Sequence, residues 1–202
     1  PGVRHMVLKE PIGPVAAFSP WNFPITIPSR KIAAALAAGC SIIIKPAEET
    51  PNSCLELARA LDDAGLPKGV LNVVFGVPAV ISEYLIASRV IRKISFTGST
   101  AVGKHLSGLA AKVIKPSTME LGGHAPVIVF EDADLDKAAQ MSAALKFRNA
   151  GQICIAPTRF YIHDRVHDAF VEKFSRIAAG LKVGDGLDPD TKMGPLANPR
   201  RM

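Results

Sequence analysis

The stretch "SIIIKPAEETP", residues 41–51, contains a complete transition from strand to helix. A short run of isoleucines ends in a lysine and a proline, which is typical of a buried β-strand reaching a turn. Thr50–Pro51 then has the pattern of a helix N-cap followed by a proline at the first helical position. Apolar residues continue at helical spacing as far as Gly65, which predicts the end of the helix.

The same alternation runs along most of the chain. It predicts an α/β fold, in which a parallel sheet is covered by helices and ligands bind where strands end and helices begin. The other predicted strands are 13–20, 70–76 and 91–98, and the other predicted helices are 25–38, 79–88, 100–111, 134–147 and 165–180.

Composition excludes several classes of protein. The longest apolar run, residues 32–44, is shorter than the roughly 20 residues of a membrane span. The net charge is +6, but the basic residues are scattered and only 6% of residues are aromatic, so neither a membrane nor a nucleic acid is an expected partner. Three distant cysteines make no disulfide framework, and the N-terminus has no signal-peptide pattern, so we expect a cytoplasmic protein.

The stretch "GSTAVGK", residues 98–104, follows a predicted strand and opens a predicted helix. It matches a phosphate-binding P-loop except that His105 stands where a Ser or Thr should hold magnesium, which weakens a nucleoside triphosphatase reading. A helix N-terminus after a Gly-Ser turn still attracts phosphate groups in general. The alternative is a simple connection between strand and helix.

Five stretches of the sequence belong together as a set of motifs: "SPWNFP" (19–24), "KPAEETP" (45–51), "FTGSTAVGK" (96–104), "MELGGHAPVIVF" (119–130) and "GQICIAPTRF" (151–160). In order and spacing, they resemble the aldehyde dehydrogenase superfamily, most closely its NAD(P)-dependent succinate-semialdehyde dehydrogenases. Proteins of that family are much longer, so the resemblance implies a central piece of one. We expect a dinucleotide-binding domain over 1–121 that lacks its N-terminal part, and the beginning of the catalytic α/β domain over 122–202 that lacks its C-terminal part.

The resemblance implies three catalytic residues. Cys154 would be the nucleophile, Asn22 would donate to the oxyanion together with the backbone N–H of Cys154, and Glu120 would be the general base. The apolar and glycine neighbours of Glu120 predict that it is buried, which would raise its pKa. The alternatives are a packing cysteine, a turn asparagine and a solvated glutamate. Cys40 and Cys54 are expected to be packing residues.

The resemblance also implies a cofactor site. Lys45 and Glu48 would bind the adenosine ribose, Gly98 and Ser99 would face the pyrophosphate, and Trp21 would line the cleft. A carboxylate that accepts from ribose hydroxyls repels a 2′-phosphate, so NAD is favoured over NADP. The alternative for the lysine and glutamate is a surface ion pair of little energetic value.

Two arginines indicate the substrate. Arg30 and Arg148 match positions that bind a carboxylate in succinate-semialdehyde dehydrogenases, and forked guanidinium donors suit that group. Each arginine could instead form an intramolecular ion pair. No metal site is predicted, because the spacing of the histidines matches none.

The sequence therefore predicts an enzyme that oxidises an aldehyde to an acid with NAD, through a cysteine thiohemiacetal and thioester. A semialdehyde such as succinate semialdehyde is the expected substrate, and a homo-oligomer is the expected state of the full-length protein. This piece alone is expected to be a very poor catalyst. Two alternatives stay open, a non-catalytic nucleotide-binding or assembly fragment and a general or CoA-linked aldehyde dehydrogenase.

Overall fold

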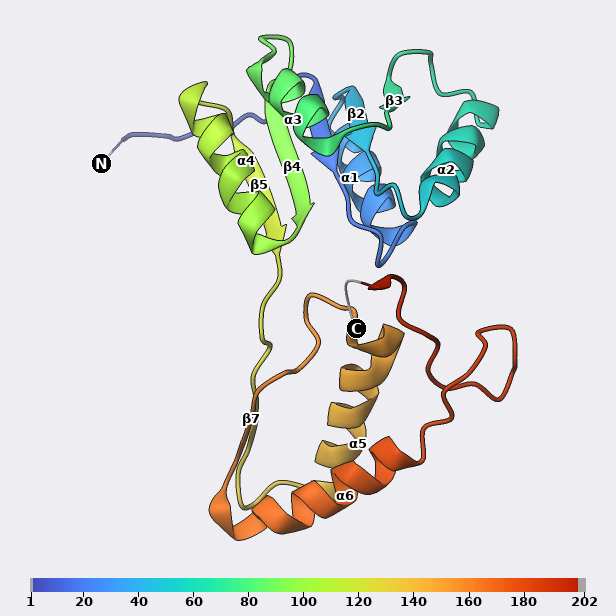
Figure 1. Cartoon of the computed structure of the whole chain (residues 1–202). Helices are drawn as coiled ribbons and strands as arrows, with labels where there is room; N and C mark the ends of the chain where they lie inside the picture. The colour runs from blue at the N-terminus through green and yellow to red at the C-terminus, as the bar shows by residue number, and fades with distance from the viewer. Residues whose placement is uncertain (1, 200–202) are drawn as a thin grey trace. The chain divides into compact units, whose positions relative to one another are not determined.

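The computed structural model describes residues 2–199 and divides into two compact units, Pro1–Leu121 and Gly122–Met202 (Figure 1). The first unit is built on a five-stranded parallel sheet in the order β3-β2-β1-β4-β5. This sheet, with its flanking helices, confirms the predicted α/β class. Its strands are β1 (Val15–Phe18), β2 (Ile42–Lys45), β3 (Leu71–Val73), β4 (Lys93–Gly98) and β5 (Ser117–Leu121).

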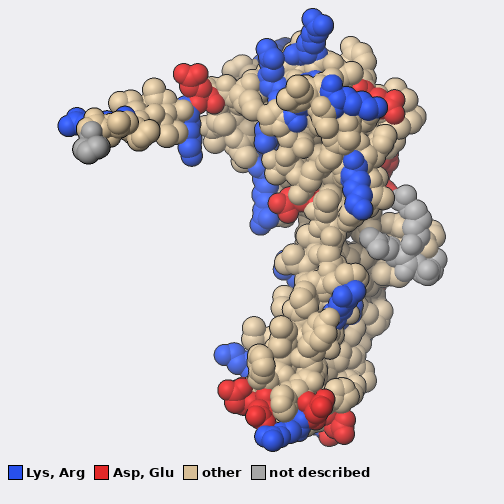
Figure 2. All heavy atoms as spheres, turned by 90° about the vertical axis from the view of Figure 1, so that its left-hand side faces the viewer, with Lys and Arg blue, Asp and Glu red and all other residues tan. Residues whose placement is uncertain are grey.

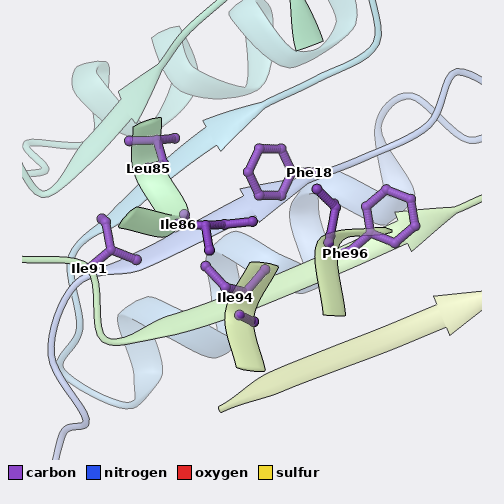
Figure 3. Close-up of a cluster of buried hydrophobic side chains, with 9 residues drawn as sticks. Phe18, Leu85, Ile86, Ile91, Ile94 and Phe96 are labelled. Atoms are coloured by element: carbon purple, nitrogen blue, oxygen red, sulfur yellow. The ribbon is translucent and has the colours of Figure 1, made fainter. Parts of the chain in front are cut away.

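Strand β1 lies at the centre of the sheet, and all four of its residues are buried. Because successive side chains of a strand point to opposite faces, Ala16 and Phe18 belong to one hydrophobic core, and Val15 and Ala17 belong to another. Figure 3 shows Phe18 beside Phe96 of β4 in the first core. Both faces of the sheet therefore need a cover of helices.

Four helices supply this cover, two for each core. Helices α1 (Thr26–Ala37) and α2 (Pro51–Asp63) pack into the core of Val15 and Ala17, while α3 (Pro78–Ala87) and α4 (Thr100–Lys112) pack into the other. Helix α2 begins as the sequence predicts, with Thr50 at the N-cap and Pro51 at the first helical position. Gly65 follows its end with a φ of 86°, a left-handed conformation that suits glycine.

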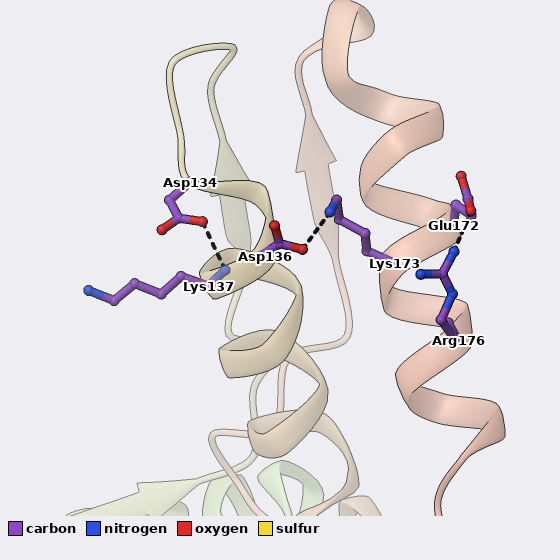
Figure 4. Close-up of polar contacts among 6 residues, drawn as sticks. All are labelled: Asp134, Asp136, Lys137, Glu172, Lys173 and Arg176. Atoms are coloured by element: carbon purple, nitrogen blue, oxygen red, sulfur yellow. Dashed lines mark hydrogen bonds and ion pairs between the residues drawn. The ribbon is translucent and has the colours of Figure 1, made fainter.

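The second unit contains two parallel strands, β6 (Val127–Val129) and β7 (Phe160–Ile162), and two helices, α5 (Leu135–Phe147) and α6 (His167–Ala179). Buried residues from one strand and both helices form its core, with a group of phenylalanine rings around them. On the surface, Asp136 of α5 pairs with Lys173 of α6 (Figure 4). Exposed pairs of this kind stabilise a fold by little, so the apolar core holds the helices together.

On the face that Figure 2 shows, the described Lys and Arg side chains of the first unit form no single patch. On the face shown in Figure 2, Lys and Arg side chains are dispersed among uncharged residues. None of the helices within residues 2–199 is long and apolar enough to span a membrane.

Candidate active site

The carboxyl ends of the parallel strands lie at one edge of the first unit's sheet. The strand order reverses between β1 and β4, and open parallel sheets bind ligands outside the carboxyl ends of the strands at such a switch point. Most of the residues singled out from the sequence belong to this unit, namely Trp21, Asn22, Arg30, Lys45, Glu48, Gly98, Ser99 and Glu120.

Lys45 is the last residue of β2 and is only 6% exposed. Its ammonium donates to the carbonyl oxygen of Pro46 at 3.1 Å and pairs with the carboxylate of Glu48. The side chain of Glu48 is 48% exposed, so its carboxylate can still accept from the hydroxyls of a ligand. The pair is therefore anchored by a buried lysine at the end of an interior strand, unlike an ordinary surface pair.

Helix α4 begins directly after β4, and Ser99 is its N-cap. The Ser99 side chain accepts from the backbone N–H of Val102 at 3.4 Å. Gly98 has no room for a side chain, because a Cβ there would lie 2.5 Å from the ring of Phe96. The remaining N–H groups of the first helical turn carry partial positive charge, which suits a phosphate.

The likeness of "GSTAVGK" to a P-loop does not extend to its structure. Gly103 lies inside helix α4, where a Cβ would be 2.4 Å from Leu121 of β5, so this glycine serves the close packing of the helix on the strand. Lys104 is exposed within the same helix. The second glycine and the lysine are therefore not parts of a phosphate-binding loop.

A buried hydroxyl supports a polar ligand at this edge. Ser19 follows β1 and is 8% exposed, and its Oγ has no hydrogen-bond partner among the described residues. An unpaired buried hydroxyl costs about 1–3 kcal/mol, which a ligand could offset. The accessible carboxylate of Glu48 and the N-terminus of α4 are further polar groups in the same unit that could bind a ligand.

Lys31 is a candidate functional residue that sequence reasoning missed. Its ammonium donates to the hydroxyl of Ser95 at 2.9 Å, and burial lowers the pKa of Lys31 to about 8. The nearby carboxylate of Glu120 partly opposes this shift by favouring the charged form. The signal was present in the helix period, because Pro28 and Ala35 are buried in α1 and Lys31 falls on the same stripe.

Glu120 lies in β5 and is exposed, so the expectation that it is buried is wrong. Strand β5 is at the edge of the sheet and pairs only with β4, and its residues are mostly exposed. Its apolar and glycine neighbours therefore do not enclose the carboxylate. Arg30 is also exposed, whereas Trp21 and Asn22 are half-buried in the turn between β1 and α1.

Cys154 belongs to the second unit, in the loop between α5 and β7. The loop starts with a 3-10 turn, Arg148–Gly151, in which Asn149, Ala150 and Gly151 have left-handed φ angles of 52°, 53° and 74°. Such conformations are unfavourable for residues other than glycine and often occur at functional sites. Arg148 follows α5 directly and is exposed.

Gln152 holds the loop just before the cysteine. It is 8% exposed, and its side-chain amide donates to the carbonyl oxygen of Asn149 at 3.0 Å and accepts from the N–H of Ala197 at 3.0 Å. Cys154 itself is a free, exposed thiol, whereas Cys40 and Cys54 are free and buried. The sequence prediction that the latter two are packing residues agrees with their positions in the core.

Known proteins resemble the chain over its whole length. The Aldehyde dehydrogenase family profile matches residues 1–202. The 4-(hydroxymethyl)benzenesulfonate dehydrogenase TsaD1 of Comamonas testosteroni is 52% identical over 201 residues, which is 100% of this chain and 42% of the relative. The NADP-dependent succinate-semialdehyde dehydrogenase GabD of Escherichia coli is 50% identical over 193 residues, 96% of this chain and 40% of the relative. The chain thus spans about two fifths of the length of these relatives.

Solved structures agree with this. The succinate-semialdehyde dehydrogenase of Burkholderia pseudomallei has a TM-score of 0.92 and 51% identity, over 95% of this chain and 40% of its own. A structure of PnpE in complex with nicotinamide adenine dinucleotide has a TM-score of 0.90 and 43% identity, over 94% of this chain and 39% of its own. Similar proteins therefore bind nicotinamide dinucleotides. By profile, sequence and fold, the chain belongs to the aldehyde dehydrogenase family.

Proposed function

We propose that the protein containing this chain oxidises an aldehyde with an anionic tail to the carboxylic acid, with NAD as the cofactor and Cys154 as the nucleophile. One observation carries the proposal: in a chain of this family, Cys154 is the exposed member of three free cysteines and lies on a hydrogen-bonded loop. An accessible thiol can form a thiolate and attack a substrate, whereas buried thiols are inert.

In the first half of the reaction, the Cys154 sulfur forms a bond to the aldehyde carbon, and the carbonyl π electrons move to the oxygen. The side-chain amide of Asn22 and the backbone N–H of Cys154 donate to this oxyanion. A bound nicotinamide supplies the acceptor for the hydride of the aldehyde carbon. The oxyanion electrons then re-form the carbonyl, which leaves a thioester on Cys154.

In the second half, Glu120 takes a proton from a water molecule, whose oxygen adds to the thioester carbon. The carbon–sulfur bond breaks, so the acid leaves and the Cys154 thiolate is restored. The exposure of Glu120 supports this role, because the base has to meet water.

Arg30 and Arg148 are proposed to bind the tail of the substrate. Both side chains are exposed, and guanidinium groups bind carboxylates and similar oxyanions with two parallel hydrogen bonds. The names of the relatives support an anionic tail, since they include dehydrogenases of succinate semialdehyde, glutarate semialdehyde and a benzenesulfonate. A four-carbon semialdehyde is the first candidate, and a sulfonate-bearing aldehyde is the second.

The test uses the full-length protein with a panel of anionic and uncharged aldehydes, and it measures the formation of NADH by its absorbance. We expect turnover that favours the anionic aldehydes and disappears in Cys154→Ala. NAD binding without aldehyde-dependent NADH would overturn the proposal in favour of a non-catalytic nucleotide-binding protein. If turnover strictly requires added coenzyme A, then coenzyme A and not water accepts the acyl group of the thioester.

A further inference from the structure

His124 and Thr158 form a hydrogen-bonded pair at the base of the loop that carries Cys154. The carbonyl oxygen of His124 accepts from the backbone N–H of Thr158 at 3.0 Å and from its hydroxyl at 2.9 Å. The ring Nδ1 of His124 lies 2.8 Å from the same hydroxyl oxygen. Three hydrogen bonds therefore join two residues that are 34 positions apart in the sequence.

The Thr158 hydroxyl can join the carbonyl and the ring of His124 in two ways. It has a single proton, and its oxygen lies within hydrogen-bond distance of both the carbonyl oxygen and the ring Nδ1. If the proton is donated to the carbonyl, the hydroxyl oxygen accepts from Nδ1–H. If the proton is donated to Nδ1, the carbonyl oxygen still accepts from the backbone N–H of Thr158. The two residues are therefore joined through the hydroxyl in either arrangement.

The pair stands where the cysteine loop joins the small sheet. The two residues precede β6 and β7, and the N–H of Val127 donates to the carbonyl oxygen of Arg159 at 2.9 Å just beyond them. Beside the pair, a Cβ on Gly123 would lie 4.0 Å from the carbonyl oxygen of Cys154, so the cysteine backbone runs close to the segment that leads into β6.

The loop is therefore held on both sides of the nucleophile. Gln152 anchors it two residues before Cys154, and Thr158 anchors it four residues after. Between these anchors, the N–H of Ala156 donates to the carbonyl oxygen of Ile153 at 3.1 Å, which forms a turn around the cysteine. Without either anchor, the loop could move, and with it both the backbone N–H and the sulfur of Cys154.

We propose that His124 and Thr158 are positioning residues, which hold the Cys154 loop in the geometry required for attack. The inference rests on the proposed function of Cys154, and it adds two residues that touch neither the substrate nor the cofactor. Holding a nucleophile and an oxyanion donor in place lowers the barrier to reaction without changing how tightly the substrate binds. The pair should therefore affect kcat and leave KM nearly unchanged.

The test compares matched variants of the full-length protein. Thr158→Val removes the hydroxyl but keeps the shape, and Thr158→Ser restores the hydroxyl. His124→Leu removes the ring nitrogen, and His124→Asn places a side-chain amide near the Nδ1 position. Two readouts are measured for each: hydrogen exchange of peptides covering 151–159 by mass spectrometry, and kcat and KM for succinate semialdehyde.

We expect Thr158→Val and His124→Leu to exchange about ten-fold faster over 151–159 and to lose about ten-fold in kcat, with KM within about two-fold, which is the effect of one or two net hydrogen bonds. The Ser and Asn variants should stay within about two-fold of the wild type. Faster exchange with unchanged kcat would show that the pair is purely structural. Unchanged exchange in variants of an active protein would refute the positioning role of the pair and leave the proposed function of Cys154 intact. A wild-type protein that forms no NADH would instead overturn the proposed function.

Discussion

The ammonium of Lys31 lies 2.9 Å from the hydroxyl oxygen of Ser95 in β4, and it is sufficiently withdrawn from water that its pKa falls to about 8. A lysine in the unfolded chain keeps its ordinary pKa of 10.5. Between these two values the unfolded state binds the proton and the folded state does not. The free energy of unfolding contributed by Lys31 therefore rises as the pH increases through this window.

Replacing Lys31 with methionine should remove this pH dependence, because the substitution deletes the titrating group and keeps the length of the side chain. From about pH 7 to about pH 10, the unfolding free energy should increase by on the order of 2 kcal/mol less in the variant than in the wild type. Urea unfolding at both pH values measures it. Lys104→Met, at an exposed position of α4, is the control and should follow the wild type. A wild-type pH profile in the Lys31 variant would contradict the assignment.

The three cysteines should differ sharply in reactivity. Burial raises the pKa of the Cys54 thiol to about 11, and Cys40 is only 3% exposed, whereas Cys154 is exposed. Because the thiolate is the nucleophile, iodoacetamide at neutral pH should alkylate Cys154 first and leave the other two unmodified in the folded protein. Peptide mass spectrometry over time measures each site. Equal alkylation rates at all three cysteines would show that the reagent reaches Cys40 and Cys54 in the folded protein.

Replacing Glu120 with glutamine should separate the two halves of the reaction. The isosteric amide cannot take a proton from water, so the thioester should accumulate on Cys154. Rapid mixing should show a burst of NADH of about one equivalent per active site, followed by a steady rate at least ~100-fold below that of the wild type. Glu131→Gln, at an exposed position in the second unit, should leave both phases intact. A variant that loses cofactor affinity but keeps its turnover would give Glu120 a different role.

The carboxylate of Glu48 should control the choice between NAD and NADP. In the proposed function Glu48 accepts from the adenosine ribose, so its negative charge would repel the 2′-phosphate of NADP. We expect Glu48→Ser to raise kcat/KM with NADP relative to NAD by roughly ten-fold, because the repulsion is removed. Glu49→Ser, at the next position, is the matched control. If both variants keep the wild-type preference, cofactor selection lies elsewhere in the protein.

The two arginines should matter only for charged substrates. Arg30→Gln and Arg148→Gln should each lower kcat/KM for succinate semialdehyde by about ten- to a hundred-fold, the effect of a lost charge-assisted hydrogen bond. Butanal, which has no anionic tail, should lose far less. Arg59→Gln on the exposed surface of α2 is the control. Equal losses on both aldehydes would assign the arginines to structure.

Much of the first unit could be predicted from the sequence because its strands are short apolar runs between helices with clear periodicity. Strand β5 could not, since an edge strand with mostly exposed residues has no apolar run to mark it. Strands β6 and β7 have three residues each and lie outside the regular alternation of strands and helices that marks the equally short β3. Helix bounds differed from the predictions by a few residues at most, because caps such as Thr50 and Ser99 mark where helices begin.

The candidate site was predictable only in part, because motifs identify residue types and not their surroundings. Cys154 was recognised from its motif, but the hydrogen bonds that His124 and Gln152 make within the loop depend on how the loop folds, which the motif does not show. The burial expected for Glu120 was wrong, since an edge strand leaves one side open. The burial of Lys31 was not predicted, because charged residues in helices usually face the solvent.

The packing at Gly103 links two separate proposed steps, cofactor binding and thioester hydrolysis. A Cβ there would lie 2.4 Å from Leu121, so the Leu121 side chain or the packing of α4 on β5 would have to shift. Helix α4 starts at the proposed phosphate site and β5 carries Glu120, so a substitution at position 103 would disturb cofactor binding and thioester hydrolysis together. In genetic terms, a single substitution at this position would be pleiotropic, because one packing residue supports two separate proposed sites.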